Sequence, residues 1–479
     1  MNKILSGLKP EIVWEIFEEI TRVPRCSGKE EKLQGFVETW AKTYNIDFKK
    51  DATGNILLTR KAERGNENIP TLMLQAHQDM VCEKKPEISH DFNSDPIPLK
   101  VDFDKVSSNG TSLGADNGIG MALAMALLID PTLSKHGKIE VILTVGEEVG
   151  FTGVRNMKPG FFSGKRMLNL DSEDVGVITI SSAGGGGTEY VVPYKKERSD
   201  SWEALKIEVT GLLGGHSGVD IQLPRFNAII LLAQGLRKLS ELMQIKLAHL
   251  EGGTRSNAIP RSAYAEVLIP MGKSGSAIEC IKNWDSSLSR SEEKGLIINT
   301  TQSLLKDAVS NEVSMKIINL ISEIPQGVFS WSKVYENLVQ TSNNLGVVKS
   351  EEDKIRIPVS TRTSNLEDYQ KNQGVLKALG EKYEVDYTQR AGSSGWNAKP
   401  DSSFLKMVEA CYNEVYGKKT KLTGVHGGLE CGAFIQLDLE LEIVSIGPSI
   451  KYPHSPSEYL EINSVNILWQ VVRKIAEFE

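Results

Sequence analysis

Five side chains of the kind that binds metal ions lie at the ends of apolar segments or at the start of an apolar helix. The segments TLMLQA (71–76), EVILTV (140–145), RMLNL (166–170) and LEIVSI (441–446) each lead into such a side chain. Two imidazoles and three carboxylates make a mixed nitrogen and oxygen donor set that suits Zn²⁺, with Co²⁺ or Mn²⁺ as substitutes. The candidate ligands are His77, Asp116, Glu148, Asp171 and His454.

The charge of this set predicts two ions. Three carboxylates carry more negative charge than one dication needs. In a two-metal site one carboxylate bridges ions about 3.5–4 Å apart, with water or hydroxide held between them. Asp116, which precedes the apolar helix, is the candidate bridging ligand.

The adjacent acids Glu147 and Glu148 allow a division of labour, because neighbouring residues point in different directions. We assign Glu148 to metal and Glu147 to general base, which takes a proton from water and passes it to the leaving amine. Asp79 lies two residues beyond His77 and is expected to hold the second N–H of that imidazole, fixing its tautomer.

Each residue also has an ordinary structural explanation. A histidine after a strand is usually a satisfied polar residue, an aspartate there is usually a helix cap, and a Glu-Glu pair is usually solvated surface. Embedded together in apolar segments, where an unpaired charge is costly, they favour a functional site.

The elements that position these side chains indicate an α/β fold with a mostly parallel mixed sheet. The four apolar segments are typical of buried parallel strands, and open α/β sheets bind ligands beyond the carboxyl ends of their strands. Between the first two segments, NGIGMALAMALLID predicts a buried helix with Asp116 or Asn117 as its cap.

From about Glu189 the sequence changes to amphipathic strands with more polar connections, which predicts an inserted α+β lid domain. We expect residues 1–186 and 397–479 to form the catalytic two-metal domain and residues 187–396 to form the lid, which is long enough for two small sheets. The glycine run 184–187 at its start fits either a phosphate-cradling loop or a flexible joint, and the joint is favoured.

Composition excludes several functions. The 479 residues carry a net charge of -7, and the basic residues are dispersed, so a nucleic-acid partner is not expected. The N-terminus predicts neither a signal peptide nor a membrane span, which favours a cytoplasmic location. Five cysteines without a CxxC pair argue against a disulfide framework or a cysteine-based structural zinc site.

The motifs AHQDMV, GADNGIGMA, GEEVGFTG, NLDSED and YPHSPSE occur in this order. They resemble the co-catalytic zinc exopeptidases, which include aminoacylases, carboxypeptidases and tripeptidases, and most closely the aminoacyl-histidine dipeptidase (Xaa-His dipeptidase, carnosinase-like) branch. The resemblance implies a zinc-binding α/β domain interrupted by a lid. It also implies a ligand arrangement: His77 and Asp171 on one ion, Glu148 and His454 on the other, and Asp116 between them.

The resemblance also implies roles for three lid residues. His216 in GLLGGHSGVD would stabilise the tetrahedral oxyanion, while Asn257 and Arg362 would bind the carboxylate of the substrate. Arg261 is a competitor of Arg362. The long lid leaves open whether His216 acts within the chain or across a homodimer.

The glycine-rich stretch HGGLECG (426–432) offers a further candidate. Glu430 could pair with the free α-amino group of a dipeptide, or the stretch could be a purely structural turn.

The function that the sequence favours is a broad-specificity metallopeptidase for small peptides, a dipeptidase that cleaves unblocked dipeptides of the Xaa-His type. A hydroxide held by two metals would attack the scissile carbonyl, with Glu147 as base. Two alternatives remain: an N-acyl amino acid amidohydrolase (aminoacylase) with the same metals, and a catalytically inactive metal-binding scaffold, against which the intact Glu147 argues.

Overall fold

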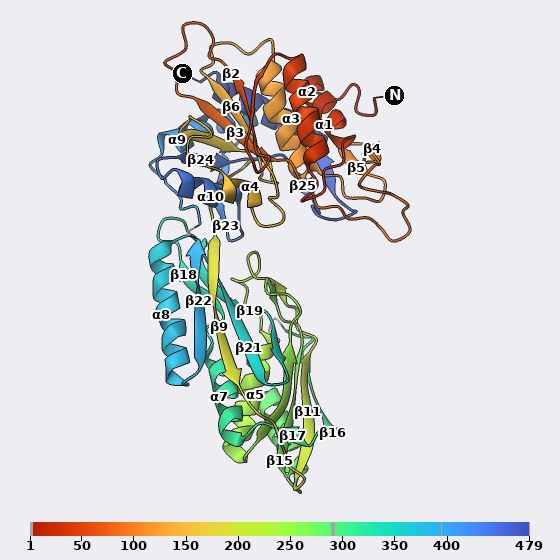
Figure 1. The fold of residues 1–479 in the computed structure, drawn as a ribbon, viewed down its shortest axis with the longest axis vertical. Helices are drawn as coiled ribbons and strands as arrows, with labels where there is room; N and C mark the ends of the chain where they lie inside the picture. The colour runs from red at the N-terminus through yellow and green to blue at the C-terminus, as the bar shows by residue number, and fades with distance from the viewer. Residues whose placement is uncertain (1–2, 289–292, 394, 479) are drawn as a thin grey trace. The chain divides into compact units, whose positions relative to one another are not determined.

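The chain folds into two units, each made of segments that are distant in the sequence (Figure 1). The computed structural model describes residues 3–288, 293–393 and 395–478. Unit 1 comprises Met1–Ser181, Trp396–Gly424 and Leu429–Glu479, and unit 2 comprises Ser182–Gly395 and Val425–Gly428.

An eight-stranded mixed sheet forms the centre of unit 1. Its strands are β1 (Asp47–Lys50), β2 (Ile56–Arg60), β3 (Leu72–His77), β6 (Ile139–Thr144), β7 (Arg166–Asn169), β8 (Val177–Ser182), β23 (Lys421–Val425) and β24 (Glu442–Ser445). They lie in the order β1-β2-β6-β3-β7-β24-β8-β23. A smaller sheet contains β4 (Leu99–Asp102), β5 (Lys105–Ser108), β25 (Ile450–Lys451) and β26 (Tyr459–Glu461).

The four apolar segments of the sequence are the four neighbouring strands β6, β3, β7 and β24. β3 runs parallel to both β6 and β7, and β24 runs parallel to β7. Every residue of β3 and β6 is buried, which explains why these strands have long apolar runs without alternation. The predicted α/β fold with a mixed sheet is confirmed, and the carboxyl ends of these strands share one edge.

Helices surround this sheet: α1 (Glu11–Thr21), α2 (Glu31–Thr43), α3 (Ala115–Ile129), α4 (Thr152–Asn156), α9 (Ser403–Tyr416), α10 (Glu430–Leu437) and α11 (Ile462–Ala476). α3 is almost entirely buried and packs against α1 and β3. The predicted cap of α3 is wrong, because Gly114 is the N-cap residue. Asp116 has non-helical φ and ψ angles of -80° and 109°, and its carboxylate faces two histidines instead of the helix.

Unit 2 contains a ten-stranded sheet rather than two small ones. Its strands are β9 (Gly184–Pro193), β11 (Trp202–Thr210), β13 (Lys246–Gly252), β15 (Ala263–Pro270), β16 (Ile297–Ser303), β18 (Gly327–Trp331), β19 (Val339–Leu345), β20 (Val348–Ser350), β21 (Lys354–Thr363) and β22 (Asp386–Ser393). The order is β16-β11-β15-β13-β20-β21-β19-β18, with β9 between β21 and β22. The pairing of β13 with β20 joins the two halves.

Four helices pack against this sheet around a continuous apolar core. The side chains of Asn227, Ser310 and Asn365 cap three of them by accepting backbone N–H bonds. The helices are α5 (Ala228–Leu242), α6 (Ser274–Ser287), α7 (Asn311–Glu323) and α8 (Leu366–Lys382). Two-residue strand pairs complete the unit: β10 (Glu197–Arg198) with β17 (Asp307–Ala308), and β12 (Gly215–His216) with β14 (Ala258–Ile259).

The glycine run 184–187 forms part of a β-strand, not a loop or a flexible joint. It begins β9, which is hydrogen-bonded to β21 on one side and β22 on the other. A Cβ on Gly186 would lie 2.2 Å from the Tyr369 hydroxyl, and one on Gly187 would lie 2.4 Å from the Val359 carbonyl oxygen. The glycines therefore permit close packing, so the prediction of a flexible joint is wrong here.

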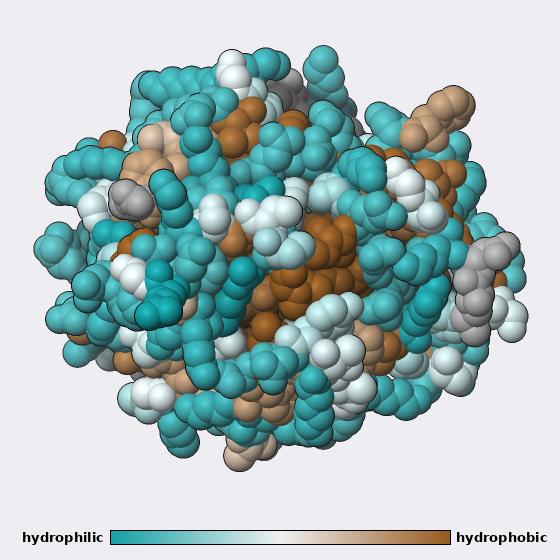
Figure 2. All heavy atoms as spheres, turned by 90° about the horizontal axis from the view of Figure 1, so that it is seen from above, coloured by the Kyte–Doolittle hydropathy of each residue, from teal (hydrophilic) through white to brown (hydrophobic). Residues whose placement is uncertain are grey.

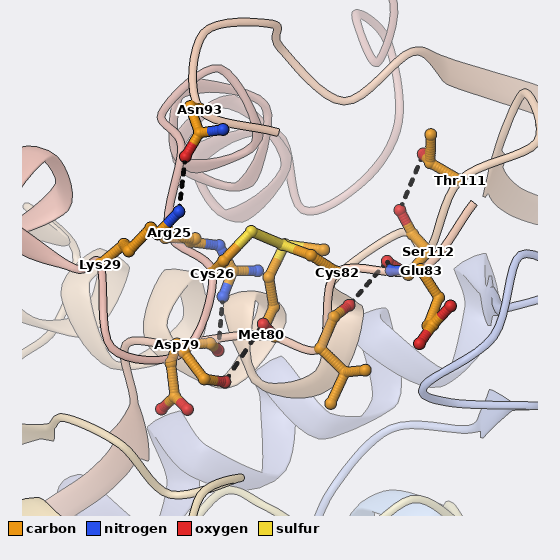
Figure 3. Close-up of a disulfide and its surroundings, with 12 residues drawn as sticks. Arg25, Cys26, Lys29, Asp79, Met80, Cys82, Glu83, Asn93, Thr111 and Ser112 are labelled. Carbon is orange, nitrogen blue, oxygen red and sulfur yellow. Dashed lines mark hydrogen bonds between the residues drawn. A yellow bond between two sulfur atoms is a disulfide. The ribbon is translucent and has the colours of Figure 1, made fainter. Parts of the chain in front are cut away.

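One disulfide links Cys26 to Cys82 beside the amino-terminal helices, with a Cα–Cα distance of 5.6 Å (Figure 3). The argument from cysteine number against disulfides is therefore wrong for this pair. Cys280, Cys411 and Cys431 are free. The disulfide ties the segment that carries Arg25 to the segment that follows β3.

No helix in the described part of the chain is long and apolar enough to cross a membrane. On the face seen in Figure 2, hydrophilic side chains predominate, and hydrophobic side chains gather near its centre.

We expect reduction of the disulfide to destabilise unit 1. The bond closes a loop with a sequence separation of 56 residues, so its loss restores chain entropy worth about 2–4 kcal/mol to the unfolded state. Urea unfolding with and without dithiothreitol measures this change. Cys82→Ser should already show the lower stability and should not respond to reductant, and equal midpoints for all samples would contradict the expectation.

Candidate metal centre

The end of β3 supplies His77 and its supporting carboxylate. The His77 ring nitrogen Nδ1 lies 3.4 Å from Asp79 Oδ1. The same carboxylate accepts backbone N–H bonds from Glu147 at 3.0 Å and Glu148 at 3.3 Å. Burial raises the pKa of Asp79, but the hydrogen bonds with His77 and the backbone outweigh it and lower the pKa to about 2. Asp79 therefore stays ionised and joins the ends of β3 and β6.

Asp116 lies between two histidines that are far apart in the sequence. Its Oδ1 is 2.9 Å from His77 Nε2, and its Oδ2 is 2.9 Å from His454 Nε2. Asp171 Oδ1 is 3.4 Å from the same His77 nitrogen, and Glu148 Oε1 is 2.8 Å from the same His454 nitrogen. All five predicted ligands thus meet at the carboxyl edge of the sheet.

Three groups of side chains could hold a cation: His77 with Glu147 and Glu148, and two groups that contain Asp116. In each group the donor atoms lie within 4.8 Å of one another. The two groups that contain Asp116 together hold all five predicted ligands: one is His77, Asp116 and Asp171, and the other is Asp116, Glu148 and His454.

The electrostatics of both groups favour positive charge. Within the described residues, no lysine or arginine forms an ion pair with Asp116, Glu148 or Asp171. Hydrogen bonds with Asp116 and Glu148 raise the pKa of His454 to about 11. A donor set of carboxylates and imidazoles that attracts positive charge fits two divalent cations, with Asp116 placed to contact both.

Glu147 belongs to neither of the two groups that share Asp116, but it lies with His77 and Glu148 in the third. One of its carboxylate oxygens lies within 4.8 Å of donor atoms of His77 and Glu148. Burial raises the pKa of Glu147 well above its usual value, and the charges of Asp171, Glu430 and Glu148 act in the same direction. This location suits a group that exchanges protons with a molecule bound at the site.

Glu430 lies inside the unit. It is fully buried, and its Oε2 accepts hydrogen bonds from Gln75 at 2.7 Å and Thr144 at 2.5 Å. Burial raises its pKa to about 8. The structure thus places Glu430 against β3 and β6, and its expected contact with an α-amino group stays a prediction.

Unit 2 brings together the three predicted lid residues. Arg362 Nε donates to Ser217 Oγ at 3.2 Å, and Ser217 N donates to the Asn257 carbonyl at 2.9 Å. His216 pairs with Ala258 in the short β12–β14 ladder. These contacts place the imidazole, the amide and the guanidinium on adjoining segments.

Arg362 differs from its competitor Arg261 in its surroundings. Arg261 is exposed, whereas Arg362 is partly buried, and burial lowers the pKa of its guanidinium. Arg362 has no carboxylate partner among the ion pairs of the described residues. A desolvated cation without an acid attracts an anionic ligand.

Three residues near the metal centre were missed in the sequence. Asn117 Nδ2 donates to the Leu170 carbonyl at 3.0 Å and to the Asp171 carboxylate. Arg25 and Glu458 hold backbone groups around the site. Two of them had a local signal: Asn117 follows Asp116 in the motif GADNGIGMA, and Glu458 lies four residues beyond His454 in the motif YPHSPSE.

An α/β sheet whose carboxyl edge gathers two imidazole and carboxylate groups around one shared aspartate is typical of two-metal hydrolases. Residues 73–477 match the model of Peptidase family M20/M25/M40. The chain is also 34% identical to the cytosol non-specific dipeptidase of Escherichia coli (strain K12) over 484 residues, covering 98% of each chain. The chain belongs to peptidase family M20/M25/M40 and is a hydrolase.

Solved structures agree with this assignment. The aminoacylhistidine dipeptidase of Vibrio alginolyticus matches with a TM-score of 0.92 and 32% identity, over 99% of this chain and 97% of that one. A tripeptidase of Staphylococcus aureus matches with a TM-score of 0.57 and 14% identity, over 98% of each chain, which shows the shared fold alone. The predicted family and the enzyme class of metallopeptidase are confirmed.

Replacing Asp79 by Asn should lower both zinc affinity and peptidase activity by about 10–100-fold. The amide offers one acceptor oxygen instead of two, so it cannot face His77 and also accept from both Glu147 and Glu148. Competition with a chromophoric chelator measures affinity. Asp91→Asn, at an exposed turn of the same unit, is the control, and wild-type behaviour of Asp79→Asn would contradict the support role.

Proposed function

We propose that this peptidase is a metal-dependent dipeptidase that hydrolyses unblocked dipeptides, with broad specificity that includes Xaa-His. The observation that carries the proposal is the pair of ligand groups sharing Asp116, in a chain that matches a dipeptidase along its whole length. The Vibrio relative, named an aminoacylhistidine dipeptidase, supports the Xaa-His preference.

Two divalent ions, zinc in the first instance with cobalt or manganese as substitutes, would occupy the two groups. His77 and Asp171 would hold one ion, Glu148 and His454 the other, and Asp116 would contact both. When bound, such ions polarise a water molecule and the scissile carbonyl. The geometry supports this division because each histidine has its own carboxylate and both share Asp116.

Glu147 is the proposed general base. It would accept a proton from the attacking water and deliver that proton to the nitrogen of the leaving amino acid, which departs as a neutral amine. Asp79 supports this role, since its carboxylate accepts the Glu147 N–H and fixes the backbone from which the base projects. His77 is oriented by the same carboxylate.

Unit 2 would serve substrate binding. We assign residues 1–186 and 397–479 to a catalytic domain and residues 187–396 to a lid. The two units support an inserted domain, but unit 2 begins at Ser182 and also includes Val425–Gly428. His216 would donate a hydrogen bond to the oxyanion of the tetrahedral intermediate. Arg362 and Asn257 would bind the substrate carboxylate. This role is supported by the fact that Arg362 donates to Ser217 and forms no ion pair with an acid in the described residues. His216 would act within the chain or from the second subunit of a homodimer.

The proposed setting is the cytoplasm, with small peptides as partners and neither nucleic acid nor membrane. The name of the Escherichia coli relative, a cytosolic enzyme, supports this location. The net charge of -7 with dispersed basic residues supports the absence of a polyanionic partner.

Hydrolysis of Ala-His beside N-acetyl-Ala-His tests the proposal. Metal-stripped protein is assayed with and without added Zn²⁺, Co²⁺ or Mn²⁺. Metal-restored cleavage of the free dipeptide alone is expected. Cleavage of the acetylated peptide alone would identify an aminoacylase, and silence on both would favour an inactive scaffold.

Glu147→Gln should abolish turnover while leaving metal content unchanged. The amide cannot accept a proton from water, and the loss of a general base lowers kcat by about 10²–10⁴-fold. Metal analysis and kcat for Ala-His are measured together. Glu189→Gln, at a partly exposed site of unit 2, is the control. Near wild-type turnover of Glu147→Gln would disprove its assigned role.

Arg362→Met should raise KM for Ala-His by at least about 10-fold, because one charge-assisted hydrogen bond contributes about 1.5–3 kcal/mol. Ala-histidinamide, which lacks the carboxylate, should be affected much less. Arg261→Met is the matched control at an exposed arginine. An equal rise in KM for both substrates would exclude carboxylate binding by Arg362. A rise in KM seen only with Arg261→Met would assign carboxylate binding to Arg261 instead.

A further inference from the structure

The carboxylate of Glu458 accepts hydrogen bonds from the backbone amides of four consecutive residues. Its Oε2 accepts N–H bonds from Leu113 at 2.8 Å and Gly114 at 3.0 Å. Its Oε1 accepts from Ala115 at 2.8 Å and Asp116 at 3.3 Å. Glu458 is only 2% exposed, so these four amides, and not water, satisfy its charge.

The four amides belong to the turn that presents Asp116. Gly114 has a φ of 68°, and Asp116 has an extended rather than helical conformation. Both oxygens of the Asp116 side chain face histidines, at 2.9 Å from His77 and 2.9 Å from His454. A rotation of this backbone would turn one oxygen away from its histidine.

Arg25 holds the same turn from its carbonyl side. Its guanidinium donates to the Gly114 carbonyl and also to the carbonyls of Gln78 at 3.0 Å and Asp79 at 2.8 Å. Figure 3 shows this side chain directed at the Asp79 backbone beside the disulfide. Arg25 therefore connects the turn of Asp116 to the segment that follows His77.

The side chains of Arg25 and Met80 pack closely against Gly114. A Cβ on Gly114 would lie 2.6 Å from Arg25 Nη2 and 2.7 Å from Met80 Sδ. The turn is thus enclosed by Glu458 on its amide side and by Arg25 on its carbonyl side.

We propose that Glu458 is a positioning residue of the metal centre, which, opposed by Arg25, fixes the orientation in which Asp116 offers one oxygen to each cation site. The proposal rests on the proposed two-metal function. Glu458 lies four residues beyond His454, so one segment supplies a ligand of one site and the support of the ligand that both sites share. Binding at the two sites is thereby coupled through a single loop.

The charge of Glu458 matters because one acceptor group serves four donors. Glu458→Gln keeps the shape of the side chain but replaces one oxygen by an NH₂ group, which is itself a donor and opposes two of the amides. Support of this kind typically changes metal affinity or activity by about 10–100-fold when it is lost.

The test compares wild type, Glu458→Gln and the control Glu461→Gln, which removes a carboxylate three residues farther along the same segment. Zn²⁺ affinity and stoichiometry are measured by chelator competition, and the visible spectrum of the Co²⁺-loaded proteins reports coordination. We expect about 10-fold or greater loss of affinity, fewer than two ions retained on dialysis, an altered Co²⁺ spectrum and a lower kcat with little change in KM. Glu461→Gln should match wild type.

Circular dichroism of the metal-free proteins separates folding from metal binding. Should Glu458→Gln not fold, Arg25→Lys tests the same turn from its carbonyl side and is expected to show the same loss of affinity. Wild-type affinity, spectrum and kcat in the folded variant would overturn the proposal. Because the metal readouts need no substrate, failure of wild type to cleave dipeptides would reject the proposed function without deciding the role of Glu458.

Discussion

The structure depends on one electrostatic constraint, the burial of several carboxylates at one edge of an apolar sheet. Asp79, Asp116, Glu148 and Asp171 all lie at this edge, where an isolated negative charge is costly. Asp79 is satisfied by His77 and by backbone amides. The other three have imidazoles but no lysine or arginine partner in the described structure. Two divalent cations would balance this charge, in agreement with the proposed chemistry.

A row of hydrogen-bonded polar side chains crosses the sheet next to the predicted ligands. Gln75 precedes His77 by two residues on β3, so both side chains point to the same face, and Asn169 is the last residue of β7, two residues before Asp171. Asn169 donates to Gln75 and accepts from Ser445 on β24, while Gln75 donates to Thr144 on β6. This row links the four parallel strands in register, so that a shift of one strand would break buried hydrogen bonds as well as separate the ligands.

Local sequence predicted the parts of the site in which strand and ligand adjoin. His77 and Asp171 follow apolar runs directly, Glu148 follows one after two residues, and parallel strands bring their ends together. Long-range partners left no comparable signal. Glu458 contacts amides more than 340 residues away in the sequence. Cys26 and Cys82 have a sequence separation of 56 residues, and only the fold brings them together. The glycine run at 184–187 was misread because its cause is the approach of Tyr369 and Val359 from distant segments, which composition does not reveal.

The two units differ in the charged side chains that they hold. Unit 1 concentrates carboxylates and histidines that stabilise positive charge. Unit 2 holds the partly buried guanidinium of Arg362, without an acid partner in the described residues, and His216 and Asn257 on adjoining segments. A site for cations needs a rigid frame, which the parallel strands and the turn around Asp116 supply. An anionic ligand binds favourably to a cation that has no acid partner, which is the property that the proposed role of Arg362 requires. In the proposed function, where Arg362 binds the substrate carboxylate, a peptide with a blocked carboxylate would leave the guanidinium unpaired, and the cost of burying it would select for a free carboxylate.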